Sequence, residues 1–313
     1  MTTEKKLKIG TRGSPLALAQ AYETRDRLLA AHPDRLSEND MEIVVIKTMG
    51  DKIQDRALSE VGGKGLFVKE IEEALYRKDI DMAVHSMKDM ETTLPDGLVI
   101  DCILPREDPR DAFISATGKT LDELPEGSVV GTSSLRRQAQ ILNRRPDLKV
   151  CIFRGAVDTR LRKLREGEAD ATLLAMAGLK RLDKLNVITQ ALEKEQMLPA
   201  VAQGAIGIEC RADDSDLRVL LSAIDDPISN IRISAERAML AVLDGSCRTP
   251  IAGYAEITSE NKLVLRASLL SPDGKDRFDV MGESQVDDGV ALGQELGQKL
   301  RGMAGPDFAA FQI

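Results

Sequence analysis

One cysteine in a polar turn is the first candidate for covalent chemistry in this sequence. Cys247 lies in the stretch 243–250, between a helical pattern of apolar residues over 231–243 and a strand pattern over 251–257. We expect this connection to be exposed, and Arg248 beside the thiol favours the thiolate, which is the nucleophilic form of cysteine. An ordinary surface or half-buried cysteine also fits this turn, so the turn alone does not indicate a function.

Basic residues are concentrated in one part of an otherwise acidic chain. The chain has 313 residues and a net charge of −8, yet residues 131–165 include ten basic residues and two acidic ones. A solvated helix face accounts for the basic residues between 162 and 165. Arg136, Arg137 and Arg154 are different, because each comes just after a predicted strand, where α/β folds bind their ligands. These three arginines therefore indicate a ligand site.

Two further strand ends carry residues that suit an acidic ligand. After the predicted strand 7–9, a glycine turn leads to Ser14 as a helix cap and Pro15 at the first helical position, which leaves backbone N–H groups ready for an anion. After the predicted strand 81–85, Lys88 and Asp89 place a cation and a carboxylate side by side. A plain cap at the end of the strand explains Asp89 as well.

The glycine-rich run 62–65 resembles a phosphate-binding loop only superficially. No Ser or Thr follows Lys64, and the glycine spacing of a nucleotide-binding loop is absent. We therefore predict no nucleotide site here. We expect the glycines to let this loop hinge while Lys64 faces an acidic ligand.

Strand and helix patterns alternate along most of the chain. Besides the segments above, strands are expected at 41–47, 112–115, 129–130, 150–153, 170–174 and 206–210, and helices at 16–29, 66–77 and 157–165. The turn at 131–134 repeats the order of strand, Gly-Thr and hydroxyl cap that is seen at 9–14, which suggests a pair of α/β lobes. From about residue 223 the pattern changes to a helix, three strands and a helix over 289–300.

The predicted fold class is therefore α/β, with two lobes and a small C-terminal α+β domain built on a three-stranded sheet. Residues 1–104 and 204–222 are assigned to the first lobe, residues 105–203 to the second, and residues 223–313 to the C-terminal domain. The boundary near residue 105 depends on the polar, proline-bounded run that begins there.

Composition argues against several classes of protein. Charged residues at 30% and apolar residues at 42% are typical of a soluble globular protein, and neither a signal peptide nor a membrane span is visible, so we predict a cytoplasmic protein with no membrane partner. The four cysteines are far apart and are expected to be reduced thiols. The two histidines belong to no zinc motif, so no metal is predicted. The acidity and the few aromatic residues argue against nucleic-acid binding.

Taken together, the motifs closely resemble those of one family, the porphobilinogen deaminases, also called hydroxymethylbilane synthases. The matching stretches follow the family's order over most of the chain: Gly10-Thr11-Arg12-Gly13-Ser14-Pro15-Leu16-Ala17, Val61-Gly62-Gly63-Lys64-Gly65-Leu66-Phe67, His85-Ser86-Met87-Lys88-Asp89, Arg106-Glu107-Asp108-Pro109-Arg110-Asp111, Gly131-Thr132-Ser133-Ser134-Leu135-Arg136-Arg137, Ala177-Gly178-Leu179-Lys180-Arg181 and Gln203-Gly204-Ala205, then Gly245-Ser246-Cys247. Each stretch alone is a weak signal, whereas the ordered set is highly specific. The sequence departs from the family pattern at Ala156 and Glu60.

The resemblance implies an enzyme that removes ammonia from four porphobilinogen molecules in turn and joins them head to tail into a linear tetrapyrrole. It implies a dipyrromethane cofactor that primes the chain and is bound through a thioether to Cys247. It also implies a monomer whose two lobes are similar to those of periplasmic binding proteins, with the active cleft between them. Each pyrrole carries an acetate and a propionate, which arginine binds well because its fork matches a carboxylate.

By the same resemblance, Asp89 is the catalytic carboxylate, which accepts hydrogen bonds from pyrrole N–H groups, stabilises the cation left after loss of ammonia and assists proton transfer. The implied cofactor-binding residues are Cys247, Lys88, Asp89, Ser133, Ser134, Arg136 and Arg137. The implied substrate-binding residues are Arg12, Ser14, Lys64, Phe67, Arg154, Arg160, Arg181 and Gln203. A place in the hydrophobic core is an equally good explanation for Phe67.

Two other functions stay open on the sequence alone. A two-lobed binding protein for a small acidic ligand would share the lobes but would need neither the thiol nor Asp89, and fold analogy does not separate it from the enzyme. A nucleic-acid-binding protein would use the arginine-rich stretch and would show affinity that falls steeply with salt.

Overall fold

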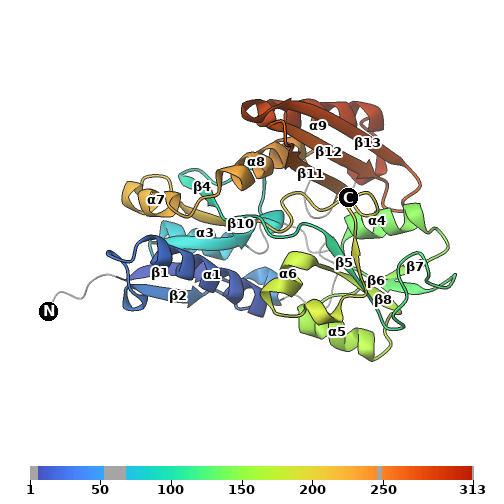
Figure 1. Cartoon of the computed structure of the whole chain (residues 1–313), viewed down its shortest axis with the longest axis horizontal. Coiled ribbons are helices and arrows are strands. Elements are labelled where there is room, and N and C mark those ends of the chain that lie inside the picture. The colour runs from blue at the N-terminus through green and yellow to red at the C-terminus, as the bar shows by residue number, and fades with distance from the viewer. Residues whose placement is uncertain (1–5, 53–67, 245–248, 312–313) are drawn as a thin grey trace. The chain divides into compact units, whose positions relative to one another are not determined.

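The computed structural model describes residues 6–52, 68–244 and 249–311 (Figure 1). The described chain forms two compact units. The first unit contains residues 6–52, 68–107 and 205–230, and the second contains residues 108–204, 231–244 and 249–311. Among the described residues, no helix is long and apolar enough to cross a membrane.

The first unit is built on a five-stranded sheet with the order β2-β1-β3-β10-β4. Its strands are β1 (Leu7–Thr11), β2 (Met41–Val45), β3 (Met82–Ser86), β4 (Leu98–Ile103) and β10 (Ile206–Arg211). Strand β1 runs parallel to β2 and β3, whereas β10 is antiparallel to β3 and β4. The carboxyl ends of β1 and β3 therefore lie at the same edge of the sheet.

Helices cover both faces of this sheet. Helices α1 (Pro15–Ala31) and α7 (Ser215–Ser222) bury Leu28 and Leu217 in a core with Ile9 and Ile208. Helix α3 (Lys69–Tyr76) packs on the other face in a core that includes Ala83. A single turn, α2 (Met49–Lys52), follows β2. Because side chains alternate along a strand, neighbouring residues of β3 and β10 face different helices.

The second unit contains a sheet with the same pattern of parallel and antiparallel strands, in the order β7-β6-β8-β5-β9. Its strands are β5 (Asp111–Ser115), β6 (Val129–Gly131), β7 (Lys149–Cys151), β8 (Ala171–Ala175) and β9 (Gln190–Leu192), and its helices are α4 (Leu135–Arg144), α5 (Val157–Arg165) and α6 (Met176–Arg181). Strand β6 is parallel to both neighbours, as β1 is in the first unit, and β5 is the antiparallel strand. The predicted echo between 9–14 and 131–134 thus corresponds to equivalent places in two sheets.

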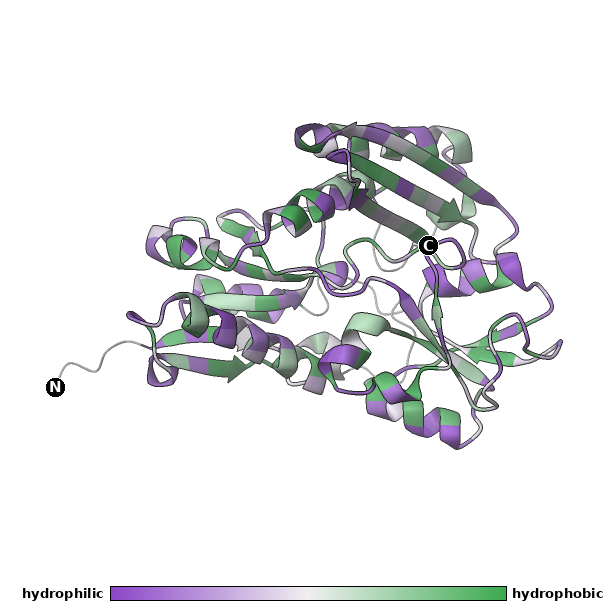
Figure 2. Cartoon of the chain, in the orientation of Figure 1, coloured by the Kyte–Doolittle hydropathy of each residue, from purple (hydrophilic) through white to green (hydrophobic). Residues whose placement is uncertain are grey.

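The second unit also contains a three-stranded antiparallel sheet made of β11 (Ile251–Ile257), β12 (Lys262–Leu270) and β13 (Arg277–Gln285). Helix α9 (Gly289–Ala304) packs on β12 and β13, and three of its glycines, Gly289, Gly293 and Gly297, lie against α8 (Pro227–Val242). Hydrophobic and hydrophilic residues are mixed along these elements, as expected for a sheet with one face covered by helices (Figure 2). The fold class predicted from the sequence is confirmed, while the predicted domain boundaries stay a prediction.

The close approach of α8 and α9 depends on Gly293. A Cβ atom at this position would meet the carbonyl oxygen of Ala235, which belongs to the backbone of α8 and cannot rotate away. We therefore expect Gly293→Ala to lower the free energy of unfolding by about 1–3 kcal/mol, the usual cost of overpacking. Urea denaturation followed by circular dichroism measures this change.

The matched control for this prediction is Gly302→Ala, which lies on the same helix with nothing within 4 Å of the added Cβ. Alanine is the better helix former, so this control is expected to leave stability unchanged or raise it by up to about 1 kcal/mol. Equal destabilisation by both substitutions would show that the helix contact is not the cause.

Several observed element ends differ from the predicted ones for identifiable reasons. Helix α8 begins at Pro227 rather than at 231, because Asp226 accepts a hydrogen bond from the Ser229 amide and Pro227 suits the first turn. Strand β7 ends at Cys151 rather than at 153, because the Phe153 amide donates to the Ser133 hydroxyl instead of continuing a ladder. The sequence analysis missed α2, β4, α6, β9 and α7.

Candidate functional site

The first unit gathers several of the predicted site residues at one edge of its sheet. Arg12 and Ser14 follow β1, and Lys88 and Asp89 lie in the short 3-10 turn that follows β3. Because β1 and β3 are parallel neighbours, both loops leave the sheet at the same edge, where α/β folds bind ligands. The Ser14 hydroxyl caps α1 by accepting from the Ala17 amide at 3.2 Å, as predicted.

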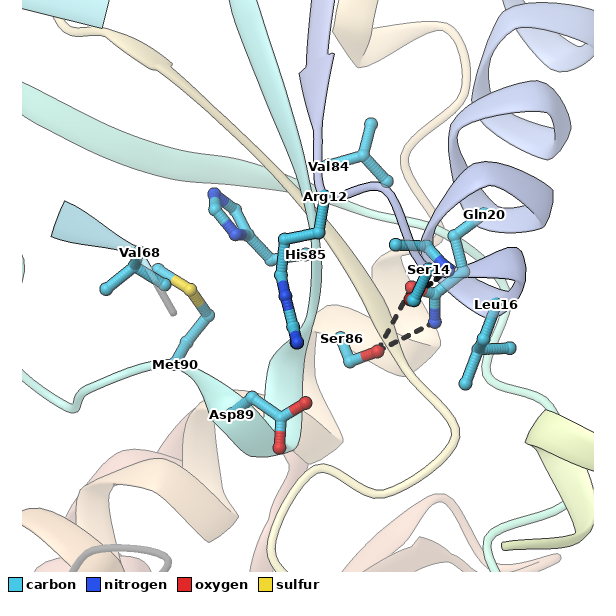
Figure 3. Close-up of a pocket in the computed structure, with 11 residues that line it drawn as sticks. Arg12, Ser14, Leu16, Gln20, Val68, Val84, His85, Ser86, Asp89 and Met90 are labelled. Carbon is cyan, nitrogen blue, oxygen red and sulfur yellow. Dashed lines mark hydrogen bonds between the residues drawn. The ribbon is translucent and has the colours of Figure 1, made fainter. Parts of the chain in front are cut away.

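These loops line a pocket whose polar walls come from α1, β3 and the two turns (Figure 3). Its polar residues are Arg12, Ser14, Gln20, His85, Ser86 and Asp89. In Figure 3 the Arg12 side chain extends toward Asp89, so that a guanidinium and an exposed carboxylate face the same space. Such a pocket suits a ligand that carries both carboxylates and N–H groups or positive charge.

The sequence analysis assigned no role to Gln20, Ser86 or His85. The Gln20 Nε2 atom donates to the Ser86 hydroxyl at 2.8 Å, and this bond joins α1 to the end of β3 in the pocket wall. One signal could have identified Gln20, because a glutamine on the apolar face of a helix is expected to find a buried polar partner. Ser86 and His85 stood in a quoted motif without an assigned function.

In the second unit, Arg136 and Arg137 lie in the first turn of α4 and bind Asp111 of β5. Arg136 Nη2 donates to Asp111 Oδ2 at 2.8 Å, and Arg137 Nε and Nη2 donate to Asp111 Oδ1 at 3.0 and 2.7 Å. All three side chains are buried. Each arginine also donates to a backbone carbonyl, Arg136 to Leu198 and Arg137 to Leu173, both at 2.7 Å.

The electrostatics of this buried group favour an ionised Asp111. Burial would raise the pKa of the Asp111 carboxyl, but the charges of Arg136 and Arg137 and the hydrogen bond from Gln203 lower this pKa to about 2. Burial lowers the pKa of Arg136 while Asp111 raises it, and a guanidinium stays charged in either case. One carboxylate between two guanidinium groups leaves a net charge of +1.

The role predicted for Arg136 and Arg137 was to hold ligand carboxylates, and the structure shows that much of their donor capacity is used by Asp111. Arg136 Nε is buried and has no hydrogen-bond partner among the described residues. The sequence analysis placed Asp111 in a polar crossing and gave it no role. A single acidic residue at the start of an apolar strand is the signal that could have identified it.

The other predicted hydroxyl groups of the second unit organise the ends of parallel strands. Ser134 caps α4 by accepting from the Arg137 amide, and the Ser133 hydroxyl accepts from the Phe153 amide at 3.1 Å. This bond fixes the loop after β7, which carries Arg154. Arg154 Nη1 is buried without a hydrogen-bond partner among the described residues. It is therefore a donor that a ligand carboxylate could satisfy.

Arg160, Arg181 and Gln203 each contact the backbone of the second unit. Arg160 Nε donates to the Gly155 carbonyl at 2.9 Å, and both Nη atoms of Arg181 donate to the Gly204 carbonyl at 3.3 Å. Gln203 Nε2 donates to the Pro109 carbonyl at 2.7 Å and lies 3.2 Å from Asp111 Oδ1. Gln203 therefore belongs to the same buried network as Arg136 and Arg137.

Three of the predicted site residues lie outside the described part of the chain. They are Lys64 and Phe67 of the glycine-rich loop, and Cys247, to which the resemblance attaches the cofactor. Their predicted roles stay predictions.

Comparison with known proteins gives two family models that together span most of the chain. The model of the porphobilinogen deaminase, dipyromethane cofactor binding domain, matches residues 7–219. The model of the porphobilinogen deaminase, C-terminal domain, matches residues 230–302.

Similar proteins carry the corresponding name. Porphobilinogen deaminase from Paracoccus denitrificans is 59% identical over 302 residues, which cover 96% of this chain and 96% of that protein. The chloroplastic porphobilinogen deaminase of Oryza sativa subsp. japonica is 54% identical over 304 residues, which cover 96% of this chain and 85% of that protein. Among solved structures, a Salmonella typhimurium periplasmic binding protein with high arginine specificity has a TM-score of 0.41 and 13% identity, covering 72% of this chain and 94% of that one.

Proposed function

The chain belongs to the porphobilinogen deaminase family, and from this premise we propose that it joins four porphobilinogen molecules head to tail, with loss of ammonia at each step, and releases the linear tetrapyrrole hydroxymethylbilane by hydrolysis. The observation that carries the proposal is the pocket of the first unit, in which Arg12 and Asp89 face the same space. A guanidinium for the substrate carboxylates and a carboxylate for its pyrrole N–H are the two groups this reaction requires.

The residues of the chain fit a dipyrromethane, the cofactor after which the first matching domain is named. Arg154 Nη1 and Arg136 Nε are buried hydrogen-bond donors with no partner among the described residues. The acetate and propionate groups of a dipyrromethane would satisfy such donors. We assign cofactor binding to the residues implied by the resemblance: Lys88, Asp89, Ser133, Ser134, Arg136 and Arg137. We also assign the thioether bond to the cofactor to Cys247. When bound, the dipyrromethane supplies the pyrrole carbon to which the first substrate unit is joined.

The chain's own residues then bind, orient and move protons. Arg12 and the cap at Ser14 bind the carboxylates of the incoming porphobilinogen, and Arg154, Arg160, Arg181 and Gln203 bind those of the growing product, while Lys64 and Phe67 act from the glycine-rich loop. Asp89 accepts hydrogen bonds from pyrrole N–H groups. Its negative charge stabilises the positive charge that develops on porphobilinogen as ammonia leaves, and it assists removal of the proton after carbon–carbon bond formation.

The experiment that tests the proposal is intact-protein mass spectrometry combined with Ehrlich's reagent, which colours pyrroles. The purified protein is expected to exceed its sequence mass by one dipyrromethane and to colour, and Cys247→Ser is expected to lack both signals. Cys151→Ser serves as the control, because this partly exposed free thiol has no assigned role and its replacement should leave the added mass in place. An active enzyme with an unmodified Cys247 would overturn the proposal.

The same experiment distinguishes the alternative of a binding protein. A protein with unmodified Cys247 that binds porphobilinogen reversibly and consumes none of it would favour a two-lobed binding protein for a small acidic ligand. No observation in the structure favours that alternative over the enzyme.

We further propose that the protein acts in the cytoplasm as a monomer, without nucleic-acid or membrane partners. The free thiols Cys102, Cys151 and Cys210 support a reducing compartment. Light scattering of the protein as it leaves a sizing column tests the monomer, and a dimer mass would contradict it.

A further inference from the structure

A fully buried carboxylate to which the proposed chemistry gives no role contacts the chain between β9 and β10. Residues 198–204 of this connection are called the crossing segment below. Glu236 of α8 is 0% exposed. Its Oε2 atom accepts a hydrogen bond from the Ala202 amide, and its Oε1 atom accepts one from the Ala255 amide of β11, both at 2.7 Å. One side chain therefore connects the crossing segment to the three-stranded sheet.

Helix α8 carries Glu236 on its buried side, where it packs with β11 and the crossing segment. Met239, three residues farther along the same helix face, is also buried. A Cβ atom at Gly253 of β11 would lie 2.7 Å from Met239 Cε and 3.1 Å from Val201 Cγ2. The Gly253 amide donates to the Pro199 carbonyl at 3.0 Å. The helix, the strand and the crossing segment therefore meet at one place.

The backbone of Ala202 has a conformation that residues other than glycine rarely adopt. Its φ is 60°, in the left-handed region, where the Cβ atom crowds the backbone. Such a conformation persists only where the surrounding structure enforces it. The hydrogen bond to Glu236 provides this restraint, because the amide of a residue that is 1% exposed must be paired.

Gln203 follows Ala202 directly, so the conformation of Ala202 determines where the Gln203 side chain lies. Gln203 Nε2 donates to the Pro109 carbonyl at 2.7 Å and lies 3.2 Å from Asp111 Oδ1. The same Oδ1 atom accepts from Arg137 Nε at 3.0 Å and from Arg137 Nη2 at 2.7 Å. The path from Glu236 to Arg137 thus consists of hydrogen bonds and a single peptide link.

The other end of the crossing segment is bound by α4. Arg136 Nη1 donates to the Leu198 carbonyl at 2.7 Å. Gln140 pairs with both backbone groups of Leu198, since its Nε2 atom donates to the carbonyl at 3.0 Å and its Oε1 atom accepts from the amide at 2.8 Å. Because both ends of the segment contact the two arginines or their shared carboxylate, a displacement of its middle would reach both guanidinium groups.

We propose that Glu236 is a positioning residue for the carboxylate-binding group formed by Arg136, Arg137 and Asp111. By keeping Ala202 in its left-handed conformation, Glu236 keeps Gln203 against Asp111. It thereby fixes the directions in which the two guanidinium groups face a carboxylate of the cofactor. This inference rests on the proposed function, since it concerns the group to which cofactor binding is assigned.

The test combines a substitution that removes the restraint with one that makes it unnecessary. Glu236→Met keeps an unbranched side chain of similar size but has no oxygen for the two amides, so Ala202 is expected to relax and the Gln203 contact to loosen. Ala202→Gly makes the left-handed conformation accessible without strain. The double variant should regain what Glu236→Met loses, because the loss of any other Glu236 contact is not reversed by a change at Ala202.

The first measurement is the Nε–H signal of Arg137 in nuclear magnetic resonance of the full-length protein, assigned by its absence in Arg137→Lys. This group donates to Asp111, so its signal reports on the local hydrogen bond as long as the protein is folded. Glu236→Met is expected to shift the signal toward those of exposed arginines, and the double variant to return it. Should Glu236→Met not fold, Glu236→Gln, which keeps one acceptor, replaces it with a smaller shift in the same direction.

The second measurement is the fraction of purified protein that carries the dipyrromethane mass. This fraction is expected to fall by about two- to tenfold in Glu236→Met, as the loss of one ordinary hydrogen bond would cause, and to recover in the double variant.

The matched control for Ala202→Gly is Asn261→Gly. Asn261 is exposed in the turn between β11 and β12 and has a φ of 56°, so glycine relieves the same kind of strain away from the crossing segment. Combined with Glu236→Met, it should restore neither the signal nor the cofactor. The proposal is overturned by an unchanged Arg137 signal in the Glu236 variant, by a shift that Ala202→Gly does not reverse, or by equal recovery with Asn261→Gly.

Failure of the proposed function gives a different result. A wild-type protein that carries no dipyrromethane and consumes no porphobilinogen removes the proposed function. The Arg137 signal still tests the role of Glu236 in that case, because this measurement needs neither substrate nor cofactor.

Discussion

Replacing Asp111 with alanine is expected to lower the free energy of unfolding by about 3–5 kcal/mol, the usual cost of removing one partner from a buried ion pair. The substitution leaves Arg136 and Arg137 buried with an uncompensated charge, since both guanidinium groups bind the Asp111 carboxylate. Urea denaturation measures the loss. If the two arginines hold the cofactor as proposed, the purified variant should also carry less bound dipyrromethane, because its arginines are free to turn away from their present directions.

The control for Asp111 is Asp122→Ala in the same unit. Asp122 also receives two hydrogen bonds from one arginine, Arg144, each at 2.8 Å, but both side chains are largely exposed. Exposed ion pairs contribute little, so this control is expected to cost less than about 1 kcal/mol. Similar losses in Asp111→Ala and Asp122→Ala would contradict the importance of burial.

The Asp111 group also predicts how stability changes in acid. The folded-state pKa of Asp111, about 2, lies below the value of roughly 3.9 for an unfolded aspartate, so the unfolded state binds the proton first. The stabilisation is therefore fully present above about pH 4 and is lost as the pH falls through about 2. Asp111→Asn should lack this part of the acid dependence, which unfolding measured between pH 5 and pH 2 would show.

Replacing Asp89 with asparagine is expected to slow porphobilinogen consumption by about two to four orders of magnitude. The variant keeps the size of the side chain and part of its hydrogen bonding, but it loses the negative charge proposed to stabilise the developing cation and to assist proton transfer. Because the Asp89 side chain is exposed in the pocket, the midpoint of thermal unfolding is expected to stay the same. The initial rate and the melting temperature, measured on one preparation, separate catalysis from folding.

Asp96→Asn is the control for the catalytic prediction. Asp96 is an exposed aspartate of the same unit, and its backbone carbonyl, rather than its side chain, accepts a hydrogen bond from Tyr76. Its replacement should leave the rate within about twofold. A rate for Asp89→Asn that matches this control would exclude Asp89 as the catalytic carboxylate.

Local patterns in the sequence were enough to predict most of the elements and the edges at which the candidate residues lie. Helix α5 and strand β11 have their predicted ends, and the caps Ser14 and Ser134 stand where hydroxyl groups precede a helical pattern. The elements that were missed are short or weakly patterned. Strand β9 has three residues, and α7 begins at Ser215 after Asp214, an N-cap that the sequence analysis did not use.

The order of motifs along the chain determined more than any single motif. Each of Gly10-Thr11, Lys88-Asp89 and Arg136-Arg137 is compatible with many proteins, but their fixed order specifies one family, and the matches to both family models agree with it. The function was therefore accessible from the sequence.

Only the tertiary structure decided which charged and polar side chains bind one another. The sequence shows that Arg136, His85 and Gln20 are present, but their partners Asp111, Glu209 and Ser86 are 25, 124 and 66 residues away. The types of these residues give no preference for one partner over another. The partner of each is selected when strand pairing and helix packing bring distant segments together and remove water from between them, because a buried charge or amide must then be satisfied by whatever side chain lies beside it.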